Sequence, residues 1–145
     1  MKLKLSITLF LGIGLLFTSC KKEGCTDADA QNYNSEAKKD DGTCTFEAKH
    51  VVWYGETAAN ALVADGATSL TYYVDGQIVG SGAANLYWTS APDCGQDGSI
   101  TISRDLGSVK TQSYTYSVVD QTGWEYWSGI FNFNANTCTT IELTW

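Results

Sequence analysis

The chain has 145 residues, enough for one ordinary domain with small attachments and too few for a large multidomain enzyme. Its 16 acidic and 9 basic side chains give a formal charge of −7, which argues against a phosphate-reading surface and therefore against nucleic-acid binding. The single histidine, His50, excludes most catalytic triads and most histidine-based metal sites.

Residues 1–19 have the pattern of a secretory signal peptide. Lys2 and Lys4 form a short positive region, and a largely apolar run without charged residues follows over 5–17. Its 13 residues are too few to cross about 30 Å of hydrocarbon comfortably, and the run begins at the N-terminus. We therefore expect this segment to be removed on export.

A cysteine follows this segment directly. The sequence LFTSC at 16–20 places small residues before Cys20 and resembles the lipobox of bacterial lipoproteins. The resemblance implies that Cys20 becomes the first mature residue and carries a lipid, which would anchor the protein firmly in a membrane. We expect a lipid-anchored tether over 20–24, at the cell outer membrane. The alternative is an ordinary signal peptide with a chance cysteine nearby.

The cysteine count fits export. Once Cys20 is assigned to lipid, four of the five cysteines remain, and in an oxidising compartment they form two disulfides. Three connectivities are open, and sequence position favours Cys25–Cys44 and Cys94–Cys138. Zinc is the rival interpretation, but the chain has no Cys-x-x-Cys pair and no histidine near a cysteine.

Residues 25–46 are expected to form a small module clipped by Cys25–Cys44, because so short a loop without apolar periodicity cannot fold alone. Residues 24–46 carry the motif GCTDxxAxNYN followed by DDGTC. This motif resembles a cysteine-bounded repeat of exported proteins from the Bacteroidetes group.

The same segment is rich in oxygen-bearing side chains. Hard oxygen ligands at close spacing suit calcium, although the EF-hand order and its terminal glutamate are missing. Turn formation explains the same residues without a metal, so both interpretations stay open and no metal site is assigned. The residues are Asp27, Asp29, Asn32, Asn34, Asp40 and Asp41.

Residues 48–145 alternate short β-rich runs with Gly, Asp and Asn turns. This pattern predicts an all-β domain, an immunoglobulin-like or Greek-key antiparallel β-sandwich of about seven or eight strands. Asp75-Gly76 between 70–74 and 77–80 predicts a hairpin with a type I′ turn. A short helical turn or a loop is expected over 57–65. Further strands are expected near 50–54, 85–88, 99–103, 113–120, 124–134 and 139–144.

A second resemblance covers nearly all of residues 50–145. The order YVDGxxVG, CG, YTY, WxG and a final Cys is similar to a β-sandwich module of Bacteroidetes lipoproteins. The matching residues begin at Tyr73 and end at Leu143. Because these families have no agreed biochemical activity, the resemblance implies fold and location rather than chemistry.

Strand parity predicts which side chains face the core. In the hairpin, we expect Val74 opposite Gln77, Tyr73 opposite Ile78 and Tyr72 opposite Val79. The expected outward set is Tyr73, Ile78, Trp124, Tyr126 and Ile130. The expected inward set is Leu70, Tyr72, Val74, Val79, Tyr114, Tyr116, Val118, Trp127, Gly129, Phe131 and Phe133.

The chain has no Gly-x-Ser-x-Gly elbow, no glycine-rich phosphate loop and no His-Glu-x-x-His motif. His50 is expected at a strand edge rather than acting as a base. The sequence therefore predicts a non-catalytic envelope protein without a cofactor, a structural or interaction module for an unknown envelope partner. The alternative is a glycan-binding surface formed by Tyr73, Trp124 and Tyr126, with Trp88 as a further candidate, because exposed rings stack on sugars. An enzyme is the remote third interpretation.

Overall fold

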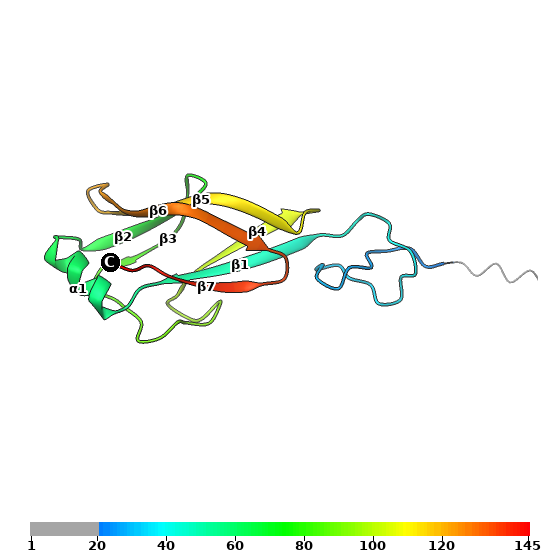
Figure 1. The fold of residues 1–145 in the computed structure, drawn as a ribbon, viewed down its shortest axis with the longest axis horizontal. Coiled ribbons are helices and arrows are strands. Elements are labelled where there is room, and N and C mark those ends of the chain that lie inside the picture. The colour runs from blue at the N-terminus through cyan, green and yellow to red at the C-terminus, as the bar shows by residue number, and fades with distance from the viewer. Residues whose placement is uncertain (1–20) are drawn as a thin grey trace, which may run out of the picture.

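Seven strands and one helix follow the N-terminal module in the computed structural model, which describes residues 21–145 (Figure 1). The all-β prediction is confirmed, whereas the expected signal peptide and Cys20 lie outside the described residues. Across 21–145, no helix is long and apolar enough to span a membrane. The elements are β1 (Phe46–Trp53), α1 (Glu56–Ala64), β2 (Ser69–Val74), β3 (Gln77–Ala83), β4 (Ile100–Gly107), β5 (Thr111–Asp120), β6 (Glu125–Asn134) and β7 (Cys138–Glu142).

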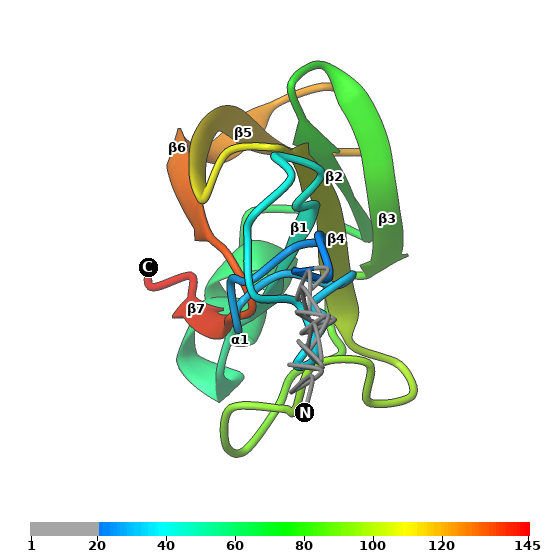
Figure 2. The same ribbon diagram turned by 90° about the vertical axis from the view of Figure 1, so that its right-hand side faces the viewer.

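The strands form two sheets, in the orders β4-β1-β7 and β3-β2-β5-β6, which are seen end-on in Figure 2. Each pairing is antiparallel except that of β1 with β7, which is parallel and runs from Lys49 opposite Cys138 to Trp53 opposite Glu142. This pair differs from the expected antiparallel pattern. The chain crosses from one sheet to the other between β6 and β7, so β7 can join the edge of β1 in the same direction.

The β2–β3 hairpin has the predicted turn. Asp75 and Gly76 have φ values of 52° and 73°, as a type I′ turn requires. Val74 lies opposite Gln77, and Tyr73 opposite Ile78, as expected. The expected pairing of Tyr72 with Val79 is wrong, because a bulge leaves Val79 unpaired and places Tyr72 opposite Gly80.

Two other segments refine the sequence interpretation. The run at 57–65 is helical, and α1 buries Ala58, Ala59 and Leu62 against the core. The prediction of a strand over 85–88 is wrong. These residues begin a long loop over 84–99, and the Trp88 amide donates to the carbonyl oxygen of Tyr54 instead of joining a strand ladder.

The inner faces of the two sheets hold the core. From the predicted inward set, Leu70, Tyr72, Val74, Val118, Phe131 and Phe133 are buried. Val79, Tyr114, Tyr116 and Trp127 are half-buried and pack against these residues. Gly129 is exposed, and a side chain there would meet the Tyr116 ring at 3.0 Å, so the tyrosine fills the space of the missing side chain.

His50 lies in the core and not at a strand edge, because β1 is the central strand of its sheet. Its Nε2 is 3.1 Å from the carbonyl oxygen of Asn132 on β6, and its Nδ1 is 3.4 Å from that of Thr139 on β7. The imidazole also lies edge-on to Phe133, with ring centroids 4.1 Å apart. Burial lowers the pKa of His50, outweighing the two carbonyl oxygens, which favour the charged form.

The outer face of the three-stranded sheet is covered by the loop over 84–99 (Figure 1). The predicted disulfide Cys94–Cys138 is present and ties this loop to β7. The Gly95 amide also donates to the Thr101 hydroxyl, which lies beside Val51 in the sheet register. Val51, on the outer face, is therefore fully buried under the loop although it is outside the main core.

We predict that the variant Cys94→Ser/Cys138→Ser loses more stability than Cys25→Ser/Cys44→Ser. The first pair closes the longer loop, worth about 4 kcal/mol against about 3 kcal/mol in the chain-entropy model. The Cys94–Cys138 disulfide also holds the loop over 84–99, which buries Val51. Thermal melts of the two double variants measure the difference. A melt of the Cys94/Cys138 variant that matches wild type would contradict this ranking.

We also predict that the folded state weakens as pH falls from about 7 to about 5. The pKa of His50 is depressed in the folded state, so the unfolded chain takes up a proton first, near its ordinary pKa of about 6.5. Stability is thus full above that pH and declines below it, by at most about 1.4 kcal/mol per pH unit from this group. Urea titrations should show that the unfolding free energy depends less on pH in His50→Phe than in wild type. Equal slopes in the two proteins would refute the assignment of this pH dependence to His50.

Candidate functional site

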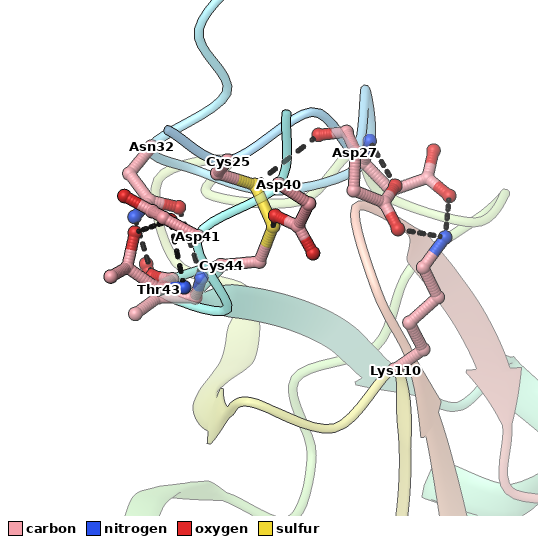
Figure 3. Close-up of a disulfide and its surroundings, with 10 residues drawn as sticks. Cys25, Asp27, Asn32, Asp40, Asp41, Thr43, Cys44 and Lys110 are labelled. Atoms are coloured by element: carbon pink, nitrogen blue, oxygen red, sulfur yellow. Dashed lines mark hydrogen bonds and ion pairs between the residues drawn. A yellow bond between two sulfur atoms is a disulfide. The ribbon is translucent and has the colours of Figure 1, made fainter. Parts of the chain in front are cut away.

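The N-terminal module is held by the predicted disulfide Cys25–Cys44, whose Cα atoms are 4.9 Å apart (Figure 3). The Asn32 side chain donates to the Thr43 carbonyl oxygen and accepts from the Thr45 amide. The Asp41 carboxylate accepts hydrogen bonds from both the amide and the hydroxyl of Thr43, and these bonds lower the pKa of Asp41. Polar side chains thus close the turns of a segment that buries little apolar surface.

Lys110, in the β4–β5 turn, joins this module to the sandwich (Figure 3). Its Nζ lies 2.7 Å from a carboxylate oxygen of Asp27 and 3.0 Å from one of Asp29. The hydrogen bond with Lys110 lowers the pKa of Asp27, and the two carboxylates raise the pKa of Lys110. The ammonium also lies 5.6 Å from the centroid of the Phe46 ring, at the start of β1.

The six residues considered for calcium are divided between these tasks. Asp27 and Asp29 contact Lys110, while Asn32 and Asp41 close turns around Thr43. Asn34 accepts from the Glu36 amide, and Asp40 lies beside the sulfur of Cys44. In residues 21–145 the one compact group of metal-ligand types joins Asp40 to Cys25 and Cys44, whose sulfurs are bonded to each other and are not thiolates. Turn closure and ion pairing with Lys110 together account for five of the six side chains, and Asp40 is the exception.

A shallow cleft of about 350 Å³ lies at the edge of β6, and the exposed Trp124 and Trp145 are among its lining residues. We call it the aromatic cleft. In Figure 1, the β5–β6 turn, α1 and the C-terminal end of the chain lie together at one end of the long axis, and the module lies at the other. The residues that line the cleft are Asp65, Trp124, Glu125, Tyr126, Trp127, Thr144 and Trp145.

Trp124 is presented by the tight turn between β5 and β6. The buried Asp120 carboxylate accepts hydrogen bonds from the Thr122 amide, the Thr122 hydroxyl and the Trp124 amide, at 2.6–2.9 Å. These bonds hold the pKa of Asp120 below its ordinary value, with the Thr122 hydroxyl contributing most. Trp124 itself is 66% exposed, so the turn fixes its backbone while its ring stays in solvent.

Tyr126 is placed differently from the prediction. A bulge in β6 pairs Val118 with Trp127 and Val119 with Glu125, which leaves Tyr126 unpaired between them. Alternation of faces fails at such a point, so Tyr126 is half-buried and packs against the core instead of standing free on the outer face. Its hydroxyl donates to the Asp65 carboxylate at 2.9 Å. Burial, together with that carboxylate, raises the pKa of Tyr126 to about 12.

Trp127 and Trp145 complete the cleft, and sequence parity identified neither as a surface residue. Trp127 stacks on the buried Tyr54 with ring centroids 6.0 Å apart, and its indole N–H donates to the Thr144 carbonyl oxygen at 2.9 Å. Trp145 is 61% exposed, with its ring centroid 5.7 Å from that of Tyr126 and 6.4 Å from that of Trp127. The signal available in the sequence was the tryptophan directly after the last β-rich run.

The other predicted aromatic residues lie elsewhere. Tyr73 is half-buried on the outer face of β2, opposite the exposed Ile78, and does not line the cleft. Trp88 lines a small hollow with Trp53 and Tyr54 beside the loop over 84–99. The structure therefore brings together Trp124 and Tyr126 from the predicted set and adds Trp127 and Trp145.

Comparison of the chain with protein-family models, with curated proteins and with solved structures finds no match. The resemblances stated above for 24–46 and 50–145 stay predictions.

We predict that Trp127→Ala costs about 3 kcal/mol of unfolding free energy, because the change removes packing against Tyr54 and the indole hydrogen bond to Thr144. Trp124→Ala should cost less than about 0.5 kcal/mol, since its ring is mostly in solvent. Urea unfolding of the two variants measures both values. Collapse of the fold in Trp124→Ala would show that its exposed position is misassigned.

Proposed function

We propose that this protein is a lipid-anchored, non-catalytic cell-envelope protein of the outer membrane that acts as an interaction module through its aromatic cleft. The observation that carries the proposal is the placement of the cleft. The tether, which directly follows the proposed lipid site at Cys20, and the module lie at one end of the long axis, and the elements whose residues line the cleft lie at the other end (Figure 1). An anchor at Cys20 would thus present the cleft away from the membrane.

The contacts of the module support its use as a spacer of fixed orientation. Lys110 bridges two carboxylates of the module, and the Gln31 amide donates to the Glu47 carboxylate of β1 at 2.8 Å. Cys25 and Ala30 are buried in the same apolar cluster as Phe46. Ionic, polar and apolar contacts therefore act together where the module meets the sandwich, which resists bending at that point.

Two features support a non-catalytic role. His50, the one histidine of the sequence, is buried between the sheets with its ring nitrogens at carbonyl oxygens, so it cannot serve as a surface base. In the cleft, the Asp65 carboxylate holds the Tyr126 hydroxyl, and the raised pKa of Tyr126 keeps that group a neutral phenol. This arrangement fixes a binding surface more readily than it activates a nucleophile.

Glycan binding is the second candidate function. Trp124 and Trp145 both expose more than half of their surface at one cleft, and flat aromatic faces pack well against the apolar faces of sugar rings. Under this candidate, neutral oligosaccharides would bind the cleft and Trp124→Ala would weaken their binding. Tyr73 would contribute nothing, because it lies outside the cleft.

We expect Cys20→Ala to abolish incorporation of labelled fatty acid and retention in the membrane fraction, because the acyl chains at Cys20 are proposed to supply the anchoring energy. Metabolic labelling followed by fractionation measures both. The control variant Cys25→Ala/Cys44→Ala also lacks cysteines but should remain labelled. Equal labelling of wild type and Cys20→Ala would refute the proposed anchor.

A further inference from the structure

Charge is unevenly distributed along the long axis of the molecule. Lys49 lies opposite Cys138 at the start of β7, Arg104 lies opposite Ala48, and Lys110 contacts the module, so these cations lie in the half of the sandwich nearest the module. The remaining lysines of the described part lie in the tether or in the module. The full basic set of residues 21–145 is Lys21, Lys22, Lys38, Lys39, Lys49, Arg104 and Lys110.

The opposite end carries acidic residues around exposed aromatic rings. Trp145 lies between two hollows: the aromatic cleft, with Asp65 and Glu125, and a neighbouring hollow of about 280 Å³ with Glu56 and Glu142. Neither hollow is lined by a lysine or an arginine. The potential around Trp145 is therefore negative on both sides, which disfavours uronic acids, phosphates and other anions.

The aromatic rings of the cleft also favour a positively charged ligand. The face of an indole or a phenol ring carries negative charge density and attracts a cation placed over it. Tyr126, Trp127 and Trp145 present rings inclined to one another by 41–84°, and Trp124 borders the same space. Inclined rings offer their faces to one cation from several directions, with the Asp65 and Glu125 carboxylates as counter-charges.

We propose that the aromatic cleft binds an organic ammonium group, held by cation–π contacts with Trp124, Trp145 and Tyr126 and by the carboxylates of Asp65 and Glu125. The inference rests on the proposed function, since it names the chemistry of the ligand for the same cleft. It differs from stacking of a neutral sugar, whose hydroxyl groups can donate hydrogen bonds to a carboxylate but which gains no charge–charge attraction from it. A quaternary headgroup and the free amine of an amino sugar both carry the required charge.

The test compares matched cations and neutral molecules on the full-length chain in a polyoxyethylene detergent. Choline and its neutral isostere 3,3-dimethyl-1-butanol form one pair, and glucosamine and glucose form the other. Titration followed by tryptophan fluorescence should show each cation binding about tenfold more tightly than its neutral partner, as a cation–π contact between surface and buried values implies. The tighter of choline and glucosamine identifies the source of the ammonium group. Binding should weaken as salt rises.

Variants locate the effect. Trp145→Ala should remove most of the binding, and Asp65→Asn/Glu125→Gln should remove the preference for the cation while leaving the rings in place. The controls Tyr33→Ala and Glu36→Gln change an exposed aromatic and an acid in the module and should have no effect. Equal affinity for a cation and its neutral partner, or no binding of either cation, would overturn the inference. Failure of the lipid anchor would instead show in the labelling of Cys20→Ala, which does not depend on the ligand.

Discussion

The parallel pairing of β7 with β1 is the constraint on which the geometry of the cleft depends. His50 on the central strand β1 meets the carbonyl oxygens of Asn132 on β6 and Thr139 on β7. With β7 fixed parallel to β1, the Leu143 amide donates to the Trp53 carbonyl oxygen, and the Thr144 carbonyl oxygen accepts from Trp127. Trp145 is thereby placed against the rings of β6. The pairing of β7 with β1 thus positions a surface residue that follows the end of β7.

Local chemistry made part of this structure predictable. Asp75-Gly76 encodes its turn through positive φ at both residues, and alternation in β2 and β5 follows from the pleat, so the hairpin and the buried Val74 and Val118 could be predicted. Tyr126 could not, because a bulge breaks the alternation at that residue alone. Trp145 needed the position of β7, which a crossover between sheets decides. The candidate site therefore lies where strand alternation and local turn chemistry do not determine the structure.

The contacts of the N-terminal module could not be predicted from the sequence either. Its Asp and Asn residues fit a list of calcium ligands, yet they divide between turn closure around Thr43 and the ion pairs with Lys110. Lys110 lies more than 80 residues from Asp27 in the sequence, so no local pattern could pair them. A cluster of oxygen-bearing side chains in a sequence can indicate either a metal site or ion pairs, and only the positions of the lysines and arginines in the fold distinguish the two.

The exposure of Trp124 and Trp145 is informative because the rest of β6 is protected. This ten-residue edge strand has one charged residue, Glu125, and an unprotected edge of that kind would invite pairing with another chain. The Tyr126 bulge disrupts the edge, His50 meets the Asn132 carbonyl oxygen, and Trp127 bonds to the segment after β7. A fold with these protections still leaves two indole rings in solvent beside carboxylates. Burial of apolar surface does not account for that placement, whereas the proposed binding of an ammonium ligand would.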